Sequence, residues 1–180
     1  ASATEVCTGT PVTFTATATD AGTTPVYAWY VNGTLTGPNS ATYTNNSLIN
    51  GDGVSCIVMS NSACATGTTA SSNVVSMIVH DNLPASVSIV AVPGNNICSG
   101  TNVTFVASAV NGGTNPTFAW YANGVPVGTT AVFSSSTLAD GNNINCIMTS
   151  DAVCATGNPA TSNDVVMTVG DVLPVSVSVS

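Results

Sequence analysis

The chain has no lysine and no arginine among its 180 residues, against eight acidic residues, so its formal net charge is −8. Nothing in it can neutralise phosphate groups, which excludes nucleic acid and anionic lipid surfaces as partners. Without lysine, the chain also cannot form lysine-derived isopeptide cross-links. Because no apolar run approaches the roughly 18 residues that span a bilayer, we expect no membrane insertion.

Residues that commonly bind metals or catalyse reactions are also scarce. The only histidine is His80, in a segment that we expect to be a linker, and its repeat counterpart is Gly170. No Cys-x-x-Cys pair occurs, which argues against zinc. Asp52 and Asp140 lie in glycine-containing turns, where turn chemistry explains an aspartate. The other acids are dispersed, so we expect no catalytic centre, no metal and no cofactor.

The chain does contain one unit of about 90 residues written twice. The first-copy residues Cys7, Phe14, Trp29, Tyr30, Asn32 and Gly33 recur 91 residues later, and Cys56, Cys64, Met77, Leu83 and Pro84 recur 90 later. Short segments alternate apolar residues with Thr and Ser, without sustained helical periodicity, which predicts an all-β fold. The Asn32-Gly33 pair predicts a hairpin turn, since both positions tolerate positive φ.

The segment Leu48–Cys56 and Trp29, which follows Ala16 by 13 residues, resemble the immunoglobulin fold. Ala16 and Ala107 replace its usual strand B cysteine, so the inter-sheet disulfide is absent. The pattern is more specifically similar to the tandem Ig-like or PKD-like repeats of secreted surface proteins from Bacteroidetes-type bacteria. The motifs that carry this likeness are Ile-Cys-x-Gly, Val-Thr-Phe, Trp-Tyr-x-Asn-Gly and Cys-Ala-Thr-Gly.

We therefore expect two tandem immunoglobulin-like β-sandwich domains and a C-terminal donor strand. The expected bounds are residues 1–81 for domain 1, which lacks its first strand, 82–171 for domain 2, and 172–180 for the donor strand. The expected core residues are Phe14, Trp29, Val54, Val58, Phe105, Trp120 and Ile144.

Six cysteines at matching repeat positions indicate an oxidising, extracellular or cell-surface setting. They are Cys7, Cys56, Cys64, Cys98, Cys146 and Cys154. Two pairings remain open. The first joins Cys7 to Cys154 inside a chain and Cys98 to Cys64 of the next chain; the second is an intradomain bond of Cys7 to Cys56, with Cys64 left over. Cys56 and Cys146 are alternatively buried thiols. Sequons that permit glycosylation occur at Asn32, Asn45 and Asn102.

The two copies differ in one strand. Copy 2 begins with the strand Leu83–Val90, which copy 1 lacks, and residues 173–180 repeat that strand at the other end of the sequence. We therefore expect the donor residues Leu173, Pro174, Val175, Val177 and Val179 to enter a groove in domain 1 of another copy, beside Val12, Phe14, Val75 and Met77. The chain begins at Ala1, which fits a processed chain or a window from a longer tandem array, and both produce this register.

Two functions from different classes fit these features. The first is a structural subunit of an extracellular bacterial filament, a linear homopolymer assembled by strand donation. The second is an adhesin module that binds a surface glycan or protein through Tyr30, Tyr121 and the loops at residues 61–73 and 151–163. Near-identical loops in both copies favour the filament. An enzyme is not expected.

Overall fold

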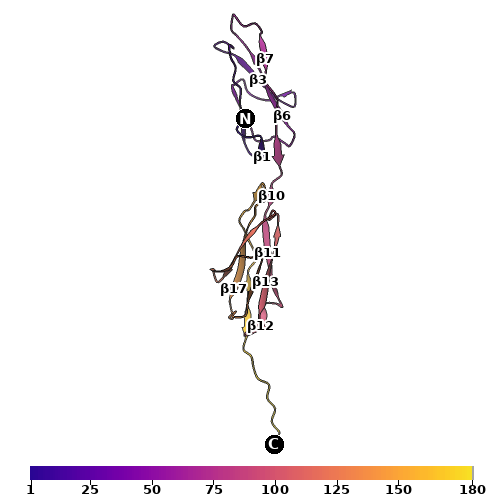
Figure 1. Cartoon of the computed structure of the whole chain (residues 1–180), viewed down its shortest axis with the longest axis vertical. Helices are drawn as coiled ribbons and strands as arrows, with labels where there is room; N and C mark the ends of the chain where they lie inside the picture. The colour runs from indigo at the N-terminus through magenta and orange to yellow at the C-terminus, as the bar shows by residue number, and fades with distance from the viewer. Residues whose placement is uncertain (180) are drawn as a thin grey trace. The chain divides into compact units, whose positions relative to one another are not determined.

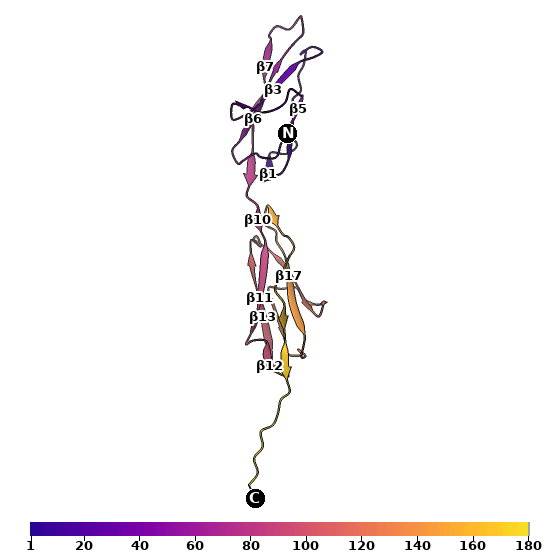
Figure 2. The same ribbon diagram turned by 180° about the vertical axis from the view of Figure 1, so that it is seen from behind.

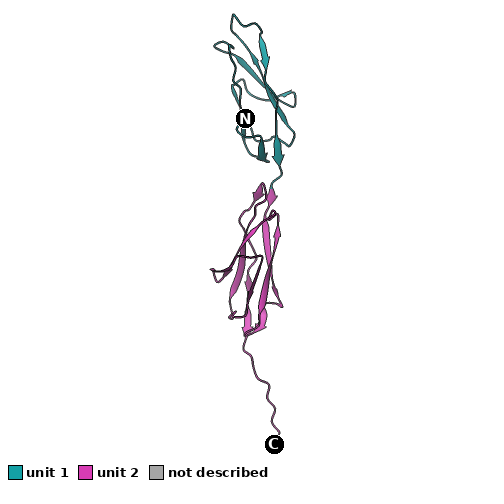
Figure 3. Ribbon diagram, viewed as in Figure 1, with its two compact units in different colours: residues 1–82 teal, residues 83–180 magenta. Residues whose placement is uncertain are grey.

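The structure is a computed structural model that describes residues 1–179. All of the regular elements in these residues are β-strands. The chain divides into two compact units, residues 1–82 and 83–180 (Figure 3). Unit 1 thus ends one residue beyond the expected domain 1, and residues 172–180 are grouped with unit 2. No helix in the described part is long and apolar enough to cross a lipid bilayer.

Unit 1 contains nine short strands that form three hydrogen-bonded groups. The largest group has the order β4-β3-β6-β7, with β8 also paired to β6; the others are β2-β5 and the parallel pair β1-β9. The strands are β1 (Glu5–Cys7), β2 (Val12–Thr15), β3 (Val26–Val31), β4 (Thr34–Leu35), β5 (Thr42–Asn45), β6 (Gly53–Met59), β7 (Thr69–Ser71), β8 (Val75–Ser76) and β9 (Ile78–His80).

Unit 2 repeats these elements and adds three, β10 and β11 at its start and β18 before β19. Its sheets have the orders β11-β13-β16 and β15-β14-β17-β19, with β20 also paired to β17, and the parallel pairs are β10-β18 and β12-β21. The strands are β10 (Leu83–Pro84), β11 (Ser86–Val92), β12 (Asn96–Cys98), β13 (Val103–Val110), β14 (Thr117–Ala122), β15 (Val125–Gly128), β16 (Val132–Ser135), β17 (Asn143–Thr149), β18 (Ala155–Thr156), β19 (Ala160–Thr161), β20 (Val165–Val166) and β21 (Thr168–Gly170).

The strand order of unit 2 is that of an immunoglobulin-like sandwich. In immunoglobulin terms β11, β13 and β16 are strands A, B and E, whereas β15, β14, β17 and β19 are strands C′, C, F and G. The strand β12 pairs in parallel with β21, as strand A′ does with G. Figure 1 and its reverse view in Figure 2 show β11 beside β13, with β17 in the facing sheet. The all-β, tandem immunoglobulin-like prediction is therefore confirmed.

Each unit has its own aromatic core. In unit 2 the rings of Phe105 and Trp120 lie 6.2 Å apart and both residues are fully buried. The indole nitrogen of Trp120 donates to the carbonyl of Thr130 at 2.7 Å, which satisfies its polar atom inside the core. Phe14 and Trp29 lie 6.3 Å apart in unit 1, where Trp29 donates to a backbone carbonyl in the same way.

The predicted core residues are buried, with one exception. Phe14, Trp29, Val54, Phe105, Trp120 and Ile144 are each exposed by 3% or less. Val58 is only partly buried and packs against the core from its edge. Its repeat counterpart, Met148, is fully buried because it packs with Val87 of β11. No described residue of unit 1 occupies the place of residues 86–91 of β11. Only the C-terminal end of that place is matched, by Ala1, the counterpart of Val92, and there the Ser2 N–H donates to the Thr13 carbonyl at 2.8 Å.

Two local expectations have different outcomes. Asn32 and Gly33 have φ values of 52° and 77°, and they connect β3 to β4 as the predicted two-residue hairpin. By contrast, His80 is not in a linker, because it belongs to β9 and pairs with Cys7 of β1. Parallel pairing with β1 extends β9 to His80, one residue beyond the alternating apolar residues from which the end of the strand was predicted.

Candidate functional site

The candidate site is an open groove in unit 1. It has a volume of about 740 Å³ and follows residues 15–21 on one side and residues 69–73 on the other. Cys56 and Val58 of β6 contribute to its lining, together with Ser60 and residues 65–67. Most of this lining consists of Ala, Thr, Ser and Gly. The lining side chains are thus small, and the groove runs along two stretches of backbone. Such a groove suits an extended peptide.

In unit 2 the same place is filled by β11. Val87 and Ile89 of this strand are 7% and 3% exposed, and Val87 packs with Met148 and Ala160. The unit 1 counterparts of Met148 and Ala160 are Val58 and Ala70, which both line the groove, and Ala70 is exposed. The two repeats therefore differ at this site by one strand.

The missing strand also changes the neighbouring backbone. In unit 2, β11 pairs with β13 along seven residues, from Ser86 opposite Val110 to Val92 opposite Thr104. The counterpart of β13 is β2, which ends at Thr15, and residues 16–19 belong to no strand. Because a strand edge without a partner exposes unpaired N–H and C=O groups, this edge is a template for another strand.

The segment that repeats the β11 sequence is unpaired in the described part of the chain. Residues 171–179 have no regular structure, and Figure 1 shows them leaving the end of β21 as an extended segment. Val175, Val177 and Val179 are exposed by 100%, 92% and 96%. They stand in register with Ala85, Val87 and Ile89, which face the interior of unit 2. The segment therefore presents the apolar face that β11 buries.

The groove lining differs from the predicted one. Val12, Phe14 and Met77 are 2% exposed or less and belong to the core of unit 1, with Val75 packed against it. These four residues were expected to line the groove. The lining lies farther along the sheet because the core beside Phe14 is already closed by Trp29 and Tyr43.

The cysteines fall into three groups. Cys7 and Cys154 are disulfide-bonded. Cys64 and Cys98 are exposed thiols, and Cys56 and Cys146 are buried thiols. The alternative Cys7–Cys56 bond is therefore wrong, and the buried-thiol interpretation of Cys56 and Cys146 is confirmed. Burial raises the pKa of both buried thiols, which disfavours the reactive thiolate.

The buried Asp52 has a structural position. Its two carboxylate oxygens accept hydrogen bonds from the Ile49 backbone at 2.9 Å and from Asn32 Nδ2 at 2.7 Å. In the repeat register Asp52 corresponds to Asn142, whose Oδ1 accepts from the Ala139 backbone at 2.8 Å. An uncharged amide thus accepts the bond equivalent to that of Ile49, as expected for turn chemistry.

Asp140 also has an asparagine at its equivalent position in the other repeat. It corresponds to Asn50, and both side chains accept a backbone N–H from the last strand of their unit, Val169 and Val79 respectively. Among the residues that the structure describes, no group of three or more His, Cys, Asp or Glu side chains is arranged to hold a metal ion.

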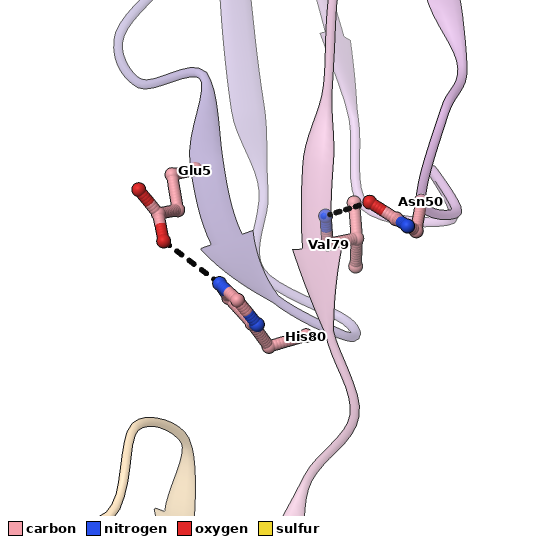
Figure 4. Close-up of polar contacts among 4 residues, drawn as sticks. All are labelled: Glu5, Asn50, Val79 and His80. Carbon is pink, nitrogen blue, oxygen red and sulfur yellow. Dashed lines mark hydrogen bonds and ion pairs between the residues drawn. The ribbon is translucent and has the colours of Figure 1, made fainter.

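His80 forms a side-chain hydrogen bond at the end of unit 1. Its Nε2 lies 2.8 Å from Glu5 Oε1, and the two side chains are 40% and 63% exposed. Figure 4 shows this pair beside the Val79–Asn50 hydrogen bond. Gly170 occupies the matching position in unit 2, where β12 and β21 pair in the same parallel register. The pair is therefore not needed to form this ladder.

The three sequons differ in how their amides are engaged. Asn32 bonds to Asp52 and Gly53, and Asn45 bonds to Tyr43 and Ser47. Asn102 is exposed, and none of the described hydrogen bonds involves its amide. A glycan on Asn32 or Asn45 would compete with these contacts, whereas one on Asn102 would not.

Comparisons with known proteins provide structural likenesses only. No protein-family model matches the chain, and no curated protein matches it. Fibronectin(III)-like modules of CbhA from Clostridium thermocellum are similar at 16% identity, with a TM-score of 0.40, over 92% of this chain and 89% of theirs. The N-terminal four Ig domains of Dscam1 isoform 8.4 match at 17% identity, with a TM-score of 0.41, over 92% of this chain and 42% of that one.

The residues that line the groove, including Ala16, Val58, Ala70 and Asn73, were not predicted as groove residues from the sequence. A usable signal was present. Each of these residues aligns with a residue of unit 2 that lies beside β11. Once the position of β11 in the sheet is known, its neighbours therefore predict which residues line the groove in unit 1.

Proposed function

We propose that the chain is a structural subunit of an extracellular bacterial filament, in which residues 173–180 of one copy fill the groove in unit 1 of the next. One observation carries the proposal: β11 fills the equivalent place in unit 2 and has the same residue pattern as residues 173–180. The occupant of the groove is thus the tail of a second copy of this chain.

The chemistry of the tail fits the groove. Val175, Val177 and Val179 would bury their side chains against the small residues of the lining, each contributing about 1.5 to 3 kcal/mol. The backbone would pair with residues 14–19, as β11 pairs with residues 105–110. Because the donor and acceptor surfaces are different, the contact is heterologous and does not need to close, so it propagates as a linear or helical filament.

The cysteines suggest covalent reinforcement of such a filament. We expect the bond of Cys7 to join Cys154, the first cysteine of copy 1 to the third of copy 2. In a head-to-tail array the remaining pair is Cys98 of one subunit and Cys64 of the subunit that receives its tail, and both are exposed thiols. When these two thiols form a disulfide they lose two protons and two electrons. The oxidant that accepts them is molecular oxygen or the disulfide of another thiol compound, which is reduced by exchange. Disulfide-bonded cysteines are compatible with an extracellular location.

The test is tail deletion. The chain lacking residues 173–180 should keep the near-ultraviolet circular dichroism of its two aromatic cores but form no filaments by electron microscopy. The intact chain under the same conditions should polymerise. Filaments of normal length from the truncated chain would refute strand donation and favour the adhesin module.

A second measurement distinguishes a polymer from a continuous tandem array. Filaments from the natural source are denatured with reductant and separated by electrophoresis. A band near the chain mass of 17.8 kDa supports separate subunits. Very large material that survives reduction shows instead that a preceding segment of the same polypeptide fills the groove.

A further inference from the structure

Unit 2 holds β11 with a side-chain contact in addition to the β13 ladder. The Ile89 backbone N–H donates to Oδ1 of Asn163 at 2.9 Å, and Nδ2 of Asn163 donates to the Ile89 carbonyl at 3.2 Å. One amide therefore satisfies both backbone groups of a single residue. It does so in the loop between β19 and β20, at the edge of β11 that faces away from β13.

Unit 1 has the same serine–asparagine arrangement, but none of the described strands lies against it. Ser72 Oγ accepts from the Cys56 backbone at 2.9 Å and donates to the carbonyl of Asn73 at 2.7 Å. Ser162 makes the matching bonds to Cys146 and Asn163, at 2.9 and 2.8 Å. Both asparagines are thus held by the same serine bridge to the central strand of their sheet.

Asn73 differs from Asn163 only in what it contacts. It is exposed and lines the groove, and among the described residues its side-chain amide has no hydrogen-bond partner. In the repeat register the residue that corresponds to Ile89 is Val179 of the tail.

We propose that Asn73 is the docking anchor of the groove: its amide binds the backbone N–H and C=O of Val179 in the incoming strand. This inference rests on the proposed strand donation and names the contact that recognises the strand. To bind Asn73, the residue of the incoming strand must have a backbone N–H and C=O that are not paired with the sheet. Its side chain must also point into the groove. The anchor therefore selects an extended strand and rejects one that lacks an N–H at this position.

The experiment uses the chain without residues 173–180 and a synthetic peptide of their sequence, Leu-Pro-Val-Ser-Val-Ser-Val-Ser, with binding measured by calorimetry. Asn73→Ala should weaken peptide binding about tenfold, because two neutral hydrogen bonds are lost. The matched control is Asn163→Ala, which removes the equivalent amide from unit 2 and should leave peptide affinity unchanged.

Peptide methylation tests the same contact without changing the protein. N-methylation at Val179 removes the N–H that faces Asn73. It should weaken binding to the unsubstituted groove about tenfold, with less further loss in the Asn73→Ala variant. N-methylation at Ser178 removes a group on the opposite edge, which faces the ladder, and should weaken binding to both proteins alike.

The outcomes separate the two proposals. If the peptide does not bind the truncated chain, strand donation itself is wrong. If it binds, but neither Asn73→Ala nor methylation at Val179 changes the affinity, docking stands and the anchor is refuted. Independent, additive effects of the two changes would also refute a direct contact between them.

Discussion

Asn32 Nδ2 donates a 2.7 Å hydrogen bond to Oδ1 of Asp52, which links the β3–β4 hairpin to the turn before β6. Asp52 is 6% exposed, so this bond and the one from Ile49 satisfy a carboxylate that water barely reaches. A side chain that resembles an acidic catalytic or calcium-binding group in the sequence is thus a structural brace.

The brace can be tested by substitution. Asp52→Ala should lower the free energy of unfolding of unit 1 by about 1 to 3 kcal/mol, because the N–H groups of Asn32 and Ile49 lose their acceptor. Asp52→Asn should cost less, since Asn142 already serves this turn in unit 2. Urea denaturation followed by tryptophan fluorescence measures both. Equal losses for the two variants would contradict the argument.

The apolar face of the tail should decide polymerisation. Val177→Asp should weaken the joint more than a hundredfold, because it removes about 1.5 to 3 kcal/mol of burial and places a charge in the groove. Ser178→Asp is the matched control, since its counterpart Ser88 is exposed on the outer face of β11. Light scattering during assembly provides the rates. The prediction fails if both variants assemble equally.

Covalent links between subunits should involve only the two exposed thiols. Filaments assembled in air should run as a ladder on electrophoresis without reductant, and Cys98→Ser should abolish the ladder. Cys146→Ala, which alters a buried thiol, should leave it intact. A ladder that persists in the Cys98→Ser variant would show that another pairing joins the subunits.

Thiol reactivity should follow burial. In the unassembled chain, iodoacetamide should modify Cys64 and Cys98 within minutes, whereas Cys56 and Cys146 react only after denaturation. Burial restricts access to the latter pair and raises the pKa of their thiols, so little thiolate forms near neutral pH. Peptide mapping by mass spectrometry identifies the modified sites. Rapid labelling of Cys56 in the native chain would show that the groove opens to its sulfur.

Asp151 should make unit 2 sensitive to acid. The backbone N–H of Asn115, and then the Thr114 hydroxyl, hold the pKa of Asp151 below its ordinary value. A carboxylate with a lowered folded pKa stabilises the fold above its unfolded pKa, near pH 4, and that contribution is lost as the pH falls through the folded value.

The matched variant comes from unit 1, where Asn61 accepts the Thr24 N–H at 3.1 Å in the same position. Asp151→Asn should therefore keep unit 2 folded and reduce the loss of stability as the pH falls below about 4, the ordinary pKa of an aspartate. Thermal unfolding of both proteins across this range provides the comparison. An unchanged pH dependence would exclude Asp151 as a source.

Local patterns in the sequence determined the all-β class, the two repeats, the Asn32-Gly33 hairpin and most of both cores. These features depend on short-range backbone preferences and on alternation along one strand, so they can be read from neighbouring residues. The extra strand in copy 2 could also be predicted, because aligning the two copies shows that copy 1 has no residues equivalent to Leu83–Val90.

Tertiary structure alone decided which residues line the groove, and it decided between the alternatives that the sequence left open for Cys56 and Cys146. Val58 and Phe14 are both apolar in the sequence, but Phe14 packs against Trp29 and Tyr43, whereas Val58 lies where a strand equivalent to β11 would cover it. Asn73 likewise has no distinguishing local signal. Its place as an anchor follows from contacts between segments about 74 residues apart in unit 2, as for Ile89 and Asn163, and only the assembled sheet brings such segments together.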